Sequence, residues 1–156
     1  MRKILVTYPE RCSGCRICEM ACSLTKEKEC NPVKSRIKVL RAEREGLDVP
    51  IVCQHCSNPL CMMVCPVDAI KRDSDTGAVV IQSSVCVGCR SCTLVCPHVA
   101  ISLNPETGCM MNCDLCGGDP ECVKWCEPEA IRFERSDVAD LERKWAAIER
   151  LSHHSK

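Results

Sequence analysis

Hydrophobic and polar positions alternate only in short stretches of this chain, and turn residues separate the stretches. Residues 26–52 are rich in charge, alternate over Arg-Ile-Lys-Val-Leu at 36–40 and contain a Glu-Gly turn at 45–46, which predicts an edge hairpin. Residues 69–81 and 100–111 each place a five-residue turn ending in Thr-Gly between two short apolar runs. The pattern therefore predicts three short β-hairpins.

The residues after 135 follow a helical period instead. Ser136 is a suitable N-cap, and the apolar residues that follow it fall on one stripe of a helix. These residues are Val138, Leu141, Trp145, Ile148 and Leu151. We expect an amphipathic helix and tail over residues 136–156, which packs on the rest of the chain or docks a partner subunit.

Cysteine changes this picture, because 18 of the 156 residues are cysteines and sixteen of them form four quartets. The quartets are Cys12, Cys15, Cys18, Cys22; Cys53, Cys56, Cys61, Cys65; Cys86, Cys89, Cys92, Cys96; and Cys113, Cys116, Cys122, Cys126. The first and third read Cys-x2-Cys-x2-Cys-x3-Cys. In the other two the middle gap is wider and is filled by turn residues.

One sequence phrase follows three of the quartets. It reads Cys-Pro-Val-Asp-Ala-Ile from Cys65, Cys-Pro-His-Val-Ala-Ile from Cys96 and Cys-Glu-Pro-Glu-Ala-Ile from Cys126, which implies duplication. We expect each unit to contain a cysteine loop, a short helix that carries the fourth cysteine, a turn and a strand. Because Glu127 replaces the usual proline, we expect the third turn to differ in detail.

The spacing of the quartets is typical of bacterial ferredoxins, in which three cysteines of a run ligate one [4Fe-4S] cluster and the fourth ligates another. Four quartets then predict four [4Fe-4S] clusters. Zinc held by four thiolates and a disulfide scaffold are the alternatives. A triplet of cysteines at two-residue spacing favours the iron–sulfur interpretation, since zinc sites recruit pairs from separate segments.

Composition and charge agree with an inorganic core. The aromatic residues are few, namely Tyr8, Trp125, Phe133 and Trp145, so the core needs small aliphatic side chains and clusters. The formal charge is zero, but sixteen thiolates and four oxidised clusters bring it to about −8, which disfavours nucleic-acid binding. We see no signal-peptide core and no apolar run of membrane-spanning length, and therefore expect a cytoplasmic location without a membrane span.

The segments around the cysteines carry a resemblance to a known family. Arg11-Cys12-Ser13-Gly14-Cys15, Cys53-Gln54-His55-Cys56, Cys86-Val87-Gly88-Cys89 and Cys113-Asp114-Leu115-Cys116 are the matching segments. Over about residues 1–135 the chain resembles the four-cluster ferredoxin-like electron-transfer subunits of molybdenum and tungsten oxidoreductases of the dimethyl sulfoxide reductase type. Its compact size is most similar to the small subunits of tungsten aldehyde oxidoreductases and related benzoyl-coenzyme A reductases.

This resemblance implies an α+β fold of two nested bacterial-type 2[4Fe-4S] ferredoxin-like modules with short hairpins and helices. The first module comprises residues 1–35 and 105–135, and the second is inserted between them as residues 36–104. The implied ligand sets are Cys12, Cys15, Cys18, Cys126; Cys22, Cys113, Cys116, Cys122; Cys53, Cys56, Cys61, Cys96; and Cys65, Cys86, Cys89, Cys92. Spacing alone also permits pairing of the first quartet with the second and the third with the fourth.

The implied function is non-catalytic transfer of single electrons, and we find no nucleotide-binding or hydrolase motif. The expected partners are a large catalytic subunit, of aldehyde oxidoreductase type, and a second electron donor or acceptor protein. Self-association into conducting oligomers is a further option. The alternatives are a freely diffusing polyferredoxin and the equivalent subunit of a hydrogenase, formate dehydrogenase or carbon monoxide dehydrogenase.

Four residues near or outside the quartets have separate interpretations. We expect Cys109 to be a small buried hydrophobic side chain and Cys30 to be a free thiol. His55, which adjoins Cys56, is expected to pack against the site or to hydrogen-bond to sulfide. Trp125 is expected to shield a cluster from solvent.

Overall fold

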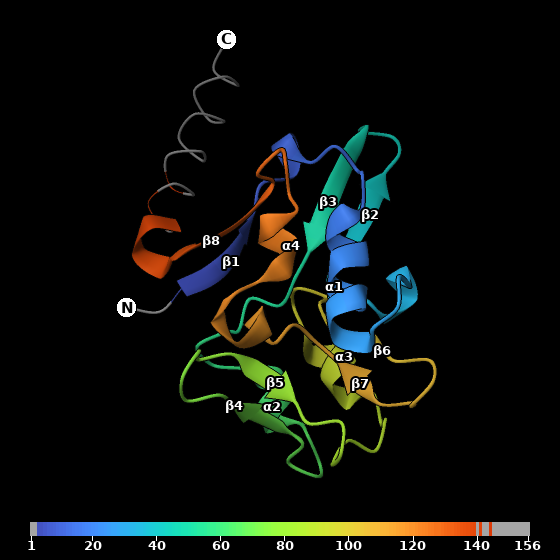
Figure 1. Cartoon of the computed structure of the whole chain (residues 1–156). Coiled ribbons are helices and arrows are strands. Elements are labelled where there is room, and N and C mark those ends of the chain that lie inside the picture. Colours follow the sequence, from blue (N-terminus) through green and yellow to red (C-terminus); the bar gives the residue numbers. More distant parts are fainter. Residues whose placement is uncertain (1–2, 140, 142–143, 145–156) are drawn as a thin grey trace.

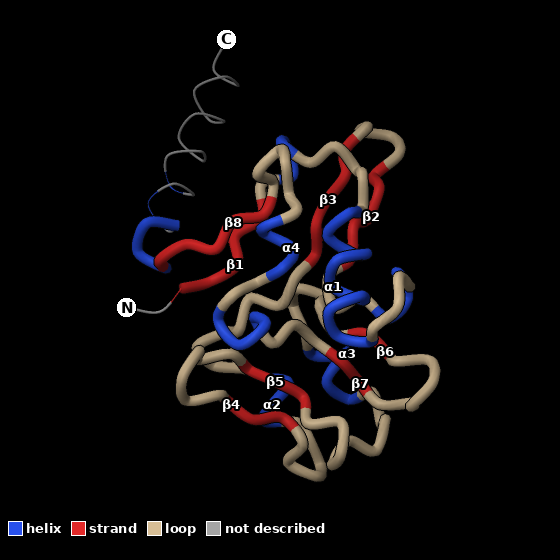
Figure 2. The backbone as a smooth tube through the Cα atoms, viewed as in Figure 1, coloured by secondary structure: helices blue, strands red, loops and turns tan. Residues whose placement is uncertain are grey.

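The computed structural model describes residues 3–139, 141 and 144 (Figure 1). Its strands are short and pair in four two-stranded antiparallel sheets (Figure 2). The strands are β1 (Lys3–Thr7), β2 (Lys38–Ala42), β3 (Leu47–Ile51), β4 (Ile70–Arg72), β5 (Val79–Ile81), β6 (Ser102–Leu103), β7 (Met110–Met111) and β8 (Ile131–Arg135). The helices are η1 (Pro9–Arg11), α1 (Ile17–Glu27), η2 (Pro32–Lys34), α2 (Leu60–Met63), α3 (Ser91–Val95), η3 (Leu115–Gly118) and α4 (Glu121–Lys124). The expected α+β class with short helices and hairpins is confirmed.

The three predicted hairpins are present as β2–β3, β4–β5 and β6–β7. Val39 lies opposite Pro50 in the first, and Ile70 lies opposite Ile81 in the second. In these two hairpins buried residues alternate with more exposed ones, which is what alternation of apolar and polar residues predicts for a half-buried strand. In β7 of the third hairpin, Met110 and Met111 are both buried.

The pairing of β1 with β8 was not predicted. The two strands lie side by side, with Leu5 opposite Phe133, although almost the whole described chain separates them (Figure 1). The N–H of Tyr8 extends the ladder by donating to the carbonyl of Ala130 at 2.8 Å. Leu5 and Ile131 are both almost fully buried, so this sheet closes one side of the core.

The expectation that each helix carries the fourth cysteine of its quartet is wrong for three of the four. α1 contains Cys18 and Cys22, but α2, α3 and α4 end before the fourth cysteine. Proline follows Cys65 and Cys96, and the residue before proline is driven out of the helical region. Cys96 accordingly has the extended values φ −77° and ψ 110°.

The turn after the fourth cysteine is the same in all three repeats, so the expected difference in the third repeat is also wrong. Asp68, Val99 and Glu129 each have φ between 51° and 53°. Their N–H groups donate to the carbonyls of Cys65, Cys96 and Cys126 at 3.3, 3.2 and 3.0 Å. The turn therefore does not require proline directly after the cysteine.

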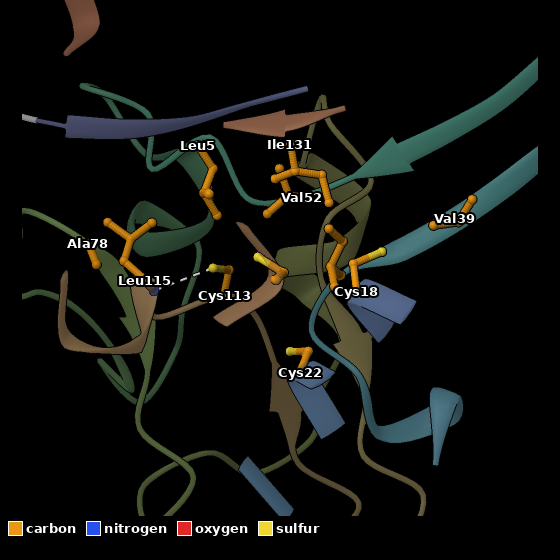
Figure 3. Close-up of a cluster of buried hydrophobic side chains, with 11 residues drawn as sticks. Leu5, Cys18, Cys22, Val39, Val52, Ala78, Cys113, Leu115 and Ile131 are labelled. Carbon is orange, nitrogen blue, oxygen red and sulfur yellow. Dashed lines mark hydrogen bonds between the residues drawn. The ribbon is translucent and has the colours of Figure 1, made fainter. Parts of the chain in front are cut away.

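Cysteine sulfur is part of the hydrophobic core. Figure 3 shows Cys18, Cys22 and Cys113 among the aliphatic side chains that β1, β8, β2 and the loops contribute. The buried members are Leu5, Cys18, Cys22, Ile37, Val39, Val52, Ala78, Cys113, Leu115, Cys122 and Ile131. A second buried group, Ile70, Val79, Cys92, Ile101 and Met110, packs beneath the two inner hairpins.

The predicted helix over residues 136–156 is only partly within the described residues. Residues 136–139, 141 and 144 are helical, and Ala139 is fully buried. Trp145, Ile148 and Leu151 of the predicted stripe lie outside the described residues. Val138 and Leu141 are exposed, at 43% and 57% of their surfaces.

Candidate metal centres

Four cavities lie among these elements, and four cysteines line each of them. Together with space that is open to solvent, they have volumes of about 300, 320, 380 and 290 Å³ in the order used below. The first cavity is lined by Cys12, Cys15, Cys18 and Cys126; the second by Cys22, Cys113, Cys116 and Cys122; the third by Cys53, Cys56, Cys61 and Cys96; and the fourth by Cys65, Cys86, Cys89 and Cys92. The structure thus brings together all sixteen candidate residues, in the groups that the resemblance implies.

Each cavity combines three cysteines of one quartet with the fourth cysteine of another. Cys18 and Cys22 are one turn apart on α1, yet Cys18 lines the first cavity and Cys22 the second. A helix that passes both cavities can serve both because residues four apart lie on one face. Pairing of the first quartet with the second would place Cys22 beside Cys53; instead it lies with the fourth quartet.

A left-handed residue directly before the second cysteine shapes every quartet. These residues are Gly14, His55, Gly88 and Leu115, with φ values of 69°, 45°, 67° and 57°. Such a conformation turns successive N–H groups toward one side and makes a concavity that suits an anion. In the fourth quartet the N–H of Leu115 donates to Sγ of Cys113 at 3.4 Å (Figure 3).

Backbone N–H groups also reach the sulfur atoms from outside the quartets. Arg36 donates to Sγ of Cys22 at 3.4 Å, Ala69 to Sγ of Cys65 at 3.2 Å and Met110 to Sγ of Cys86 at 3.4 Å. Hydrogen bonds to a charged acceptor are stronger than those to a neutral one. The donors are therefore placed to stabilise cysteine sulfur that shares the charge of an iron–sulfur cluster.

Burial instead favours the protonated form of several cysteines, because it raises the pKa of their free thiols. It raises the pKa of Cys92 to about 11 and, together with the neighbouring Glu19, raises the pKa of Cys18 to about 12. It also raises the pKa of Cys113 and Cys122. A buried thiolate needs a compensating positive charge, and iron supplies one. Four sulfur donors around one apolar cavity thus fit a [4Fe-4S] cluster.

The second cavity is the one with an ion-pair network in its lining. Lys26 and Arg36 each place a nitrogen 2.8 Å from Oδ2 of Asp114, and the Oδ1 atom accepts from the N–H of Cys116. Burial alone would raise the pKa of Asp114, but the hydrogen bond from Lys26 and the charge of Arg36 hold that pKa below its usual value. The carboxylate thereby compensates two cations beside four cysteines.

Two side chains near the cysteines, those of His55 and Trp125, line cavities. His55 is 1% exposed and lines the third cavity, and its Nδ1 accepts from the N–H of Val79 at 3.0 Å. Trp125 lines the first cavity but is 60% exposed, so it covers the cavity only from one side.

The two cysteines outside the quartets line none of the four cavities. Cys30 is exposed, as expected for a free thiol. Cys109 is only partly buried, which corrects the expectation of a buried hydrophobic side chain. Its Sγ lies 3.5 Å from the carbonyls of Ser83 and Cys86, and these contacts keep it at the surface of the β6–β7 turn.

Over the residues that the structure describes, no helix is long and apolar enough to cross a membrane. Within the same residues, no three His, Cys, Asp or Glu side chains are arranged to hold one metal ion.

Known proteins are similar to this sequence over most of its length. A family model described as a 4Fe-4S dicluster domain matches residues 44–136. The polyferredoxin-like subunit of an aliphatic sulfonate oxidoreductase from Pyrococcus furiosus is 42% identical over 92% of this chain and 83% of its own. The thiosulfate reductase electron transfer subunit PhsB of Salmonella typhi is 36% identical over 90% and 79%. A probable anaerobic dimethyl sulfoxide reductase chain, YnfG of Escherichia coli, is 35% identical over 88% and 75%.

The fold, the cysteine-lined cavities and these relatives define an iron–sulfur protein. The chain belongs to the 4Fe-4S dicluster domain family, and its cofactors are [4Fe-4S] clusters. It is a non-catalytic electron-transfer subunit of the kind found in oxidoreductase complexes, which confirms the resemblance drawn from the cysteine segments. The zinc and disulfide alternatives are therefore set aside.

Proposed function

We propose that the chain carries single electrons along four [4Fe-4S] clusters between a catalytic molybdenum or tungsten oxidoreductase subunit and a second redox protein. The four cysteines of each cavity are the proposed ligands of one cluster. The observation that carries the proposal is the interleaving, in which every cavity draws three cysteines from one quartet and one from another. A [4Fe-4S] cluster supplies a centre that accepts and releases one electron at a time.

Three connections arrange the cavities in one series. α1 joins the first to the second through Cys18 and Cys22. Asn112 adjoins Cys113 of the second cavity and donates to Sγ of Cys53 in the third. Cys92 and Cys96, on and just after α3, join the fourth to the third. The series supports an electron path with two ends.

Exposure of the cysteines supports entry and exit at those ends. Cys15 lines the first cavity, Cys89 lines the fourth, and both are exposed. The cysteines of the second and third cavities are buried or partly buried. Partner proteins therefore approach the terminal clusters, while the chain insulates the inner pair from solvent.

The interleaving also supports the nested modules, with residues 1–35 and 105–135 around the first two cavities and residues 36–104 around the other two. For the catalytic partner we favour the aldehyde oxidoreductase type. The sulfonate oxidoreductase relative makes aliphatic sulfonates the second substrate class to test.

Cluster number and ligand sets are tested together. Anaerobically purified protein is analysed for iron and acid-labile sulfide, and electron paramagnetic resonance is recorded after dithionite reduction. We expect about sixteen irons per chain, from four clusters of four irons. In Cys22→Ser we expect loss or alteration of one cluster, that of the second cavity. Cys30→Ser is the matched control, because Cys30 is exposed and lines none of the cavities. Two clusters in the wild type, or an unchanged Cys22→Ser spectrum, would refute the assignment.

The partner is tested by affinity purification of the tagged chain from its native cells. We expect a large molybdenum- or tungsten-containing subunit in the complex, and cluster reduction when an aldehyde is added to it. Reduction by an aliphatic sulfonate and not by aldehydes would replace the aldehyde assignment. Turnover by the isolated chain would contradict the division of labour between subunits.

A further inference from the structure

Asn112 is a buried polar residue at the junction of the second and third cavities. It is 4% exposed and directly precedes Cys113, which lines the second cavity. Its side chain reaches β5 and Sγ of Cys53, which lines the third cavity. Asn112 thus belongs to one proposed module, and its side-chain amide contacts the other.

The contacts with β5 fix the orientation of this amide. The N–H of Ile81 donates to Oδ1 at 3.1 Å, and Nδ2 donates to the carbonyl of Val79 at 2.6 Å. A flipped amide would set donor against donor and acceptor against acceptor. The remaining N–H of Nδ2 therefore belongs to Sγ of Cys53, 3.5 Å away.

The neighbouring imidazole does not provide this hydrogen bond. Nδ1 of His55 lies 3.7 Å from Sγ of Cys53, but it already accepts from the N–H of Val79. A ring nitrogen that accepts carries no proton to donate. The side-chain donor on Cys53 is consequently Asn112.

A side-chain amide distinguishes the third cavity from its neighbours, since in the fourth cavity the side-chain partner is a hydroxyl, the Oγ of Ser91 at 3.5 Å from Sγ of Cys89. Cys22, Cys65, Cys86 and Cys113 receive their hydrogen bonds from backbone N–H groups. Among the residues that the structure describes, Asn112 supplies the side-chain amide N–H that reaches a cysteine sulfur. Unlike the backbone donors, it is a group that one substitution can remove.

We propose that Asn112 is a positioning residue that holds β5 against the second cavity and raises the reduction potential of the cluster ligated by Cys53. This inference rests on the ligand sets proposed above. Hydrogen bonds to sulfur are one of the means by which a protein tunes such clusters. The one-electron reduced state places more negative charge on the sulfur, so an N–H donor stabilises it more than the oxidised state.

The test is a redox titration of holoprotein followed by electron paramagnetic resonance. In Asn112→Leu we expect one of the four one-electron steps to lose about tenfold in its reduced-to-oxidised ratio at a fixed potential, or about 59 mV. The other three steps stay unchanged. The affected step is assigned by comparison with Cys56→Ser, which alters the same cluster.

Because Asn112→Leu also removes both hydrogen bonds to β5, Asn112→Asp is the second variant. An aspartate keeps the acceptor for Ile81 but has no N–H for Cys53, so the same step moves down at least as far. Asn104→Leu is the matched control: Asn104 is also a buried asparagine, but its Oδ1 only accepts from Glu106 and Thr107 in a turn.

The outcomes separate this inference from the proposed function. Fewer than four clusters in the wild type would refute the proposed function. Four clusters in every protein, with all four steps of Asn112→Asp at wild-type values, would refute the role of Asn112 alone. A uniform shift of all four steps, equal in Asn104→Leu, would also refute it, because it would indicate a general loss of packing.

Discussion

Alanine at position 88 tests how closely the cysteine loop of the third quartet packs against the β6–β7 turn. Gly88 has φ +67°, and a Cβ there would lie 2.4 Å from the carbonyl oxygen of Gly108. Both conditions disfavour alanine, the first through the left-handed backbone and the second through a contact with backbone that has little freedom to move.

The matched substitution is Gly108→Ala, because Gly108 has φ +69° and no atom within 4 Å of its Cβ position. The left-handed backbone costs about 1–2 kcal/mol in either variant. Overpacking adds about 1–3 kcal/mol in Gly88→Ala alone. If that increment lowers the barrier to cluster loss, it corresponds to a rate difference of roughly 5- to 150-fold.

The assay follows bleaching of the cluster absorbance in anaerobic holoprotein, at fixed temperature and with excess iron chelator. We expect Gly88→Ala to add one fast phase, because Gly88 adjoins Cys89 of the fourth cavity. Gly108→Ala should lose clusters more slowly than Gly88→Ala, because it carries only the cost of the left-handed backbone. Equal rates for the two variants would show that the Gly88 contact does not restrain the loop, and the steric reasoning would fail.

Three further predictions concern charge, metal and protons. Asp114→Asn leaves Lys26 and Arg36 uncompensated beside the second cavity, so it should raise the potential of one cluster in a redox titration. The same variant should remove one source of the acid sensitivity of folding stability. The pKa of Asp114 is lower in the folded protein than its unfolded value of about 3.9, so the carboxylate stabilises the fold at pH values above 3.9. That stabilisation is lost as the pH falls through the folded pKa. Anaerobic removal of iron should abolish most far-ultraviolet circular dichroism, since cysteine sulfur forms much of the core; an unchanged spectrum would contradict this. Cluster reconstitution should release protons at neutral pH, because the pKa of Cys92 is about 11 and that of Cys18 about 12, and calorimetry in two buffers of different ionisation enthalpy measures this.

The sequence was most informative where spacing and turn chemistry act locally. Thr-Gly after Asp73 and after Asn104 predicted two hairpins because only a few residues decide a tight turn. The residues expected to share each metal centre do line one cavity each, although their ligation stays a prediction. That grouping came from the resemblance, since the spacing within a quartet does not determine which other quartet supplies the fourth cysteine.

The remaining features depend on contacts between distant segments. Lys3–Thr7 reads as a short apolar stretch, and nothing within it identifies β8 as its partner. Asn112 resembles any polar residue at the end of a hairpin until β5 is placed beside it. Cys109 was expected to be buried because it lies on the hairpin that leads into Cys113, but the fold leaves it only partly buried.

The pairing of β1 with β8 has a consequence for the order in which the protein folds and binds its clusters during synthesis. A chain leaves the ribosome from its N-terminus at about 5–20 residues per second. The middle of the sequence supplies every cysteine of the third and fourth cavities once Cys96 has emerged. The first cavity must wait for Cys126, and β1 waits for β8. The ligand sets encoded in the middle of the gene are therefore complete before those that use its two ends. The earliest cysteines translated are among the last that can ligate a cluster.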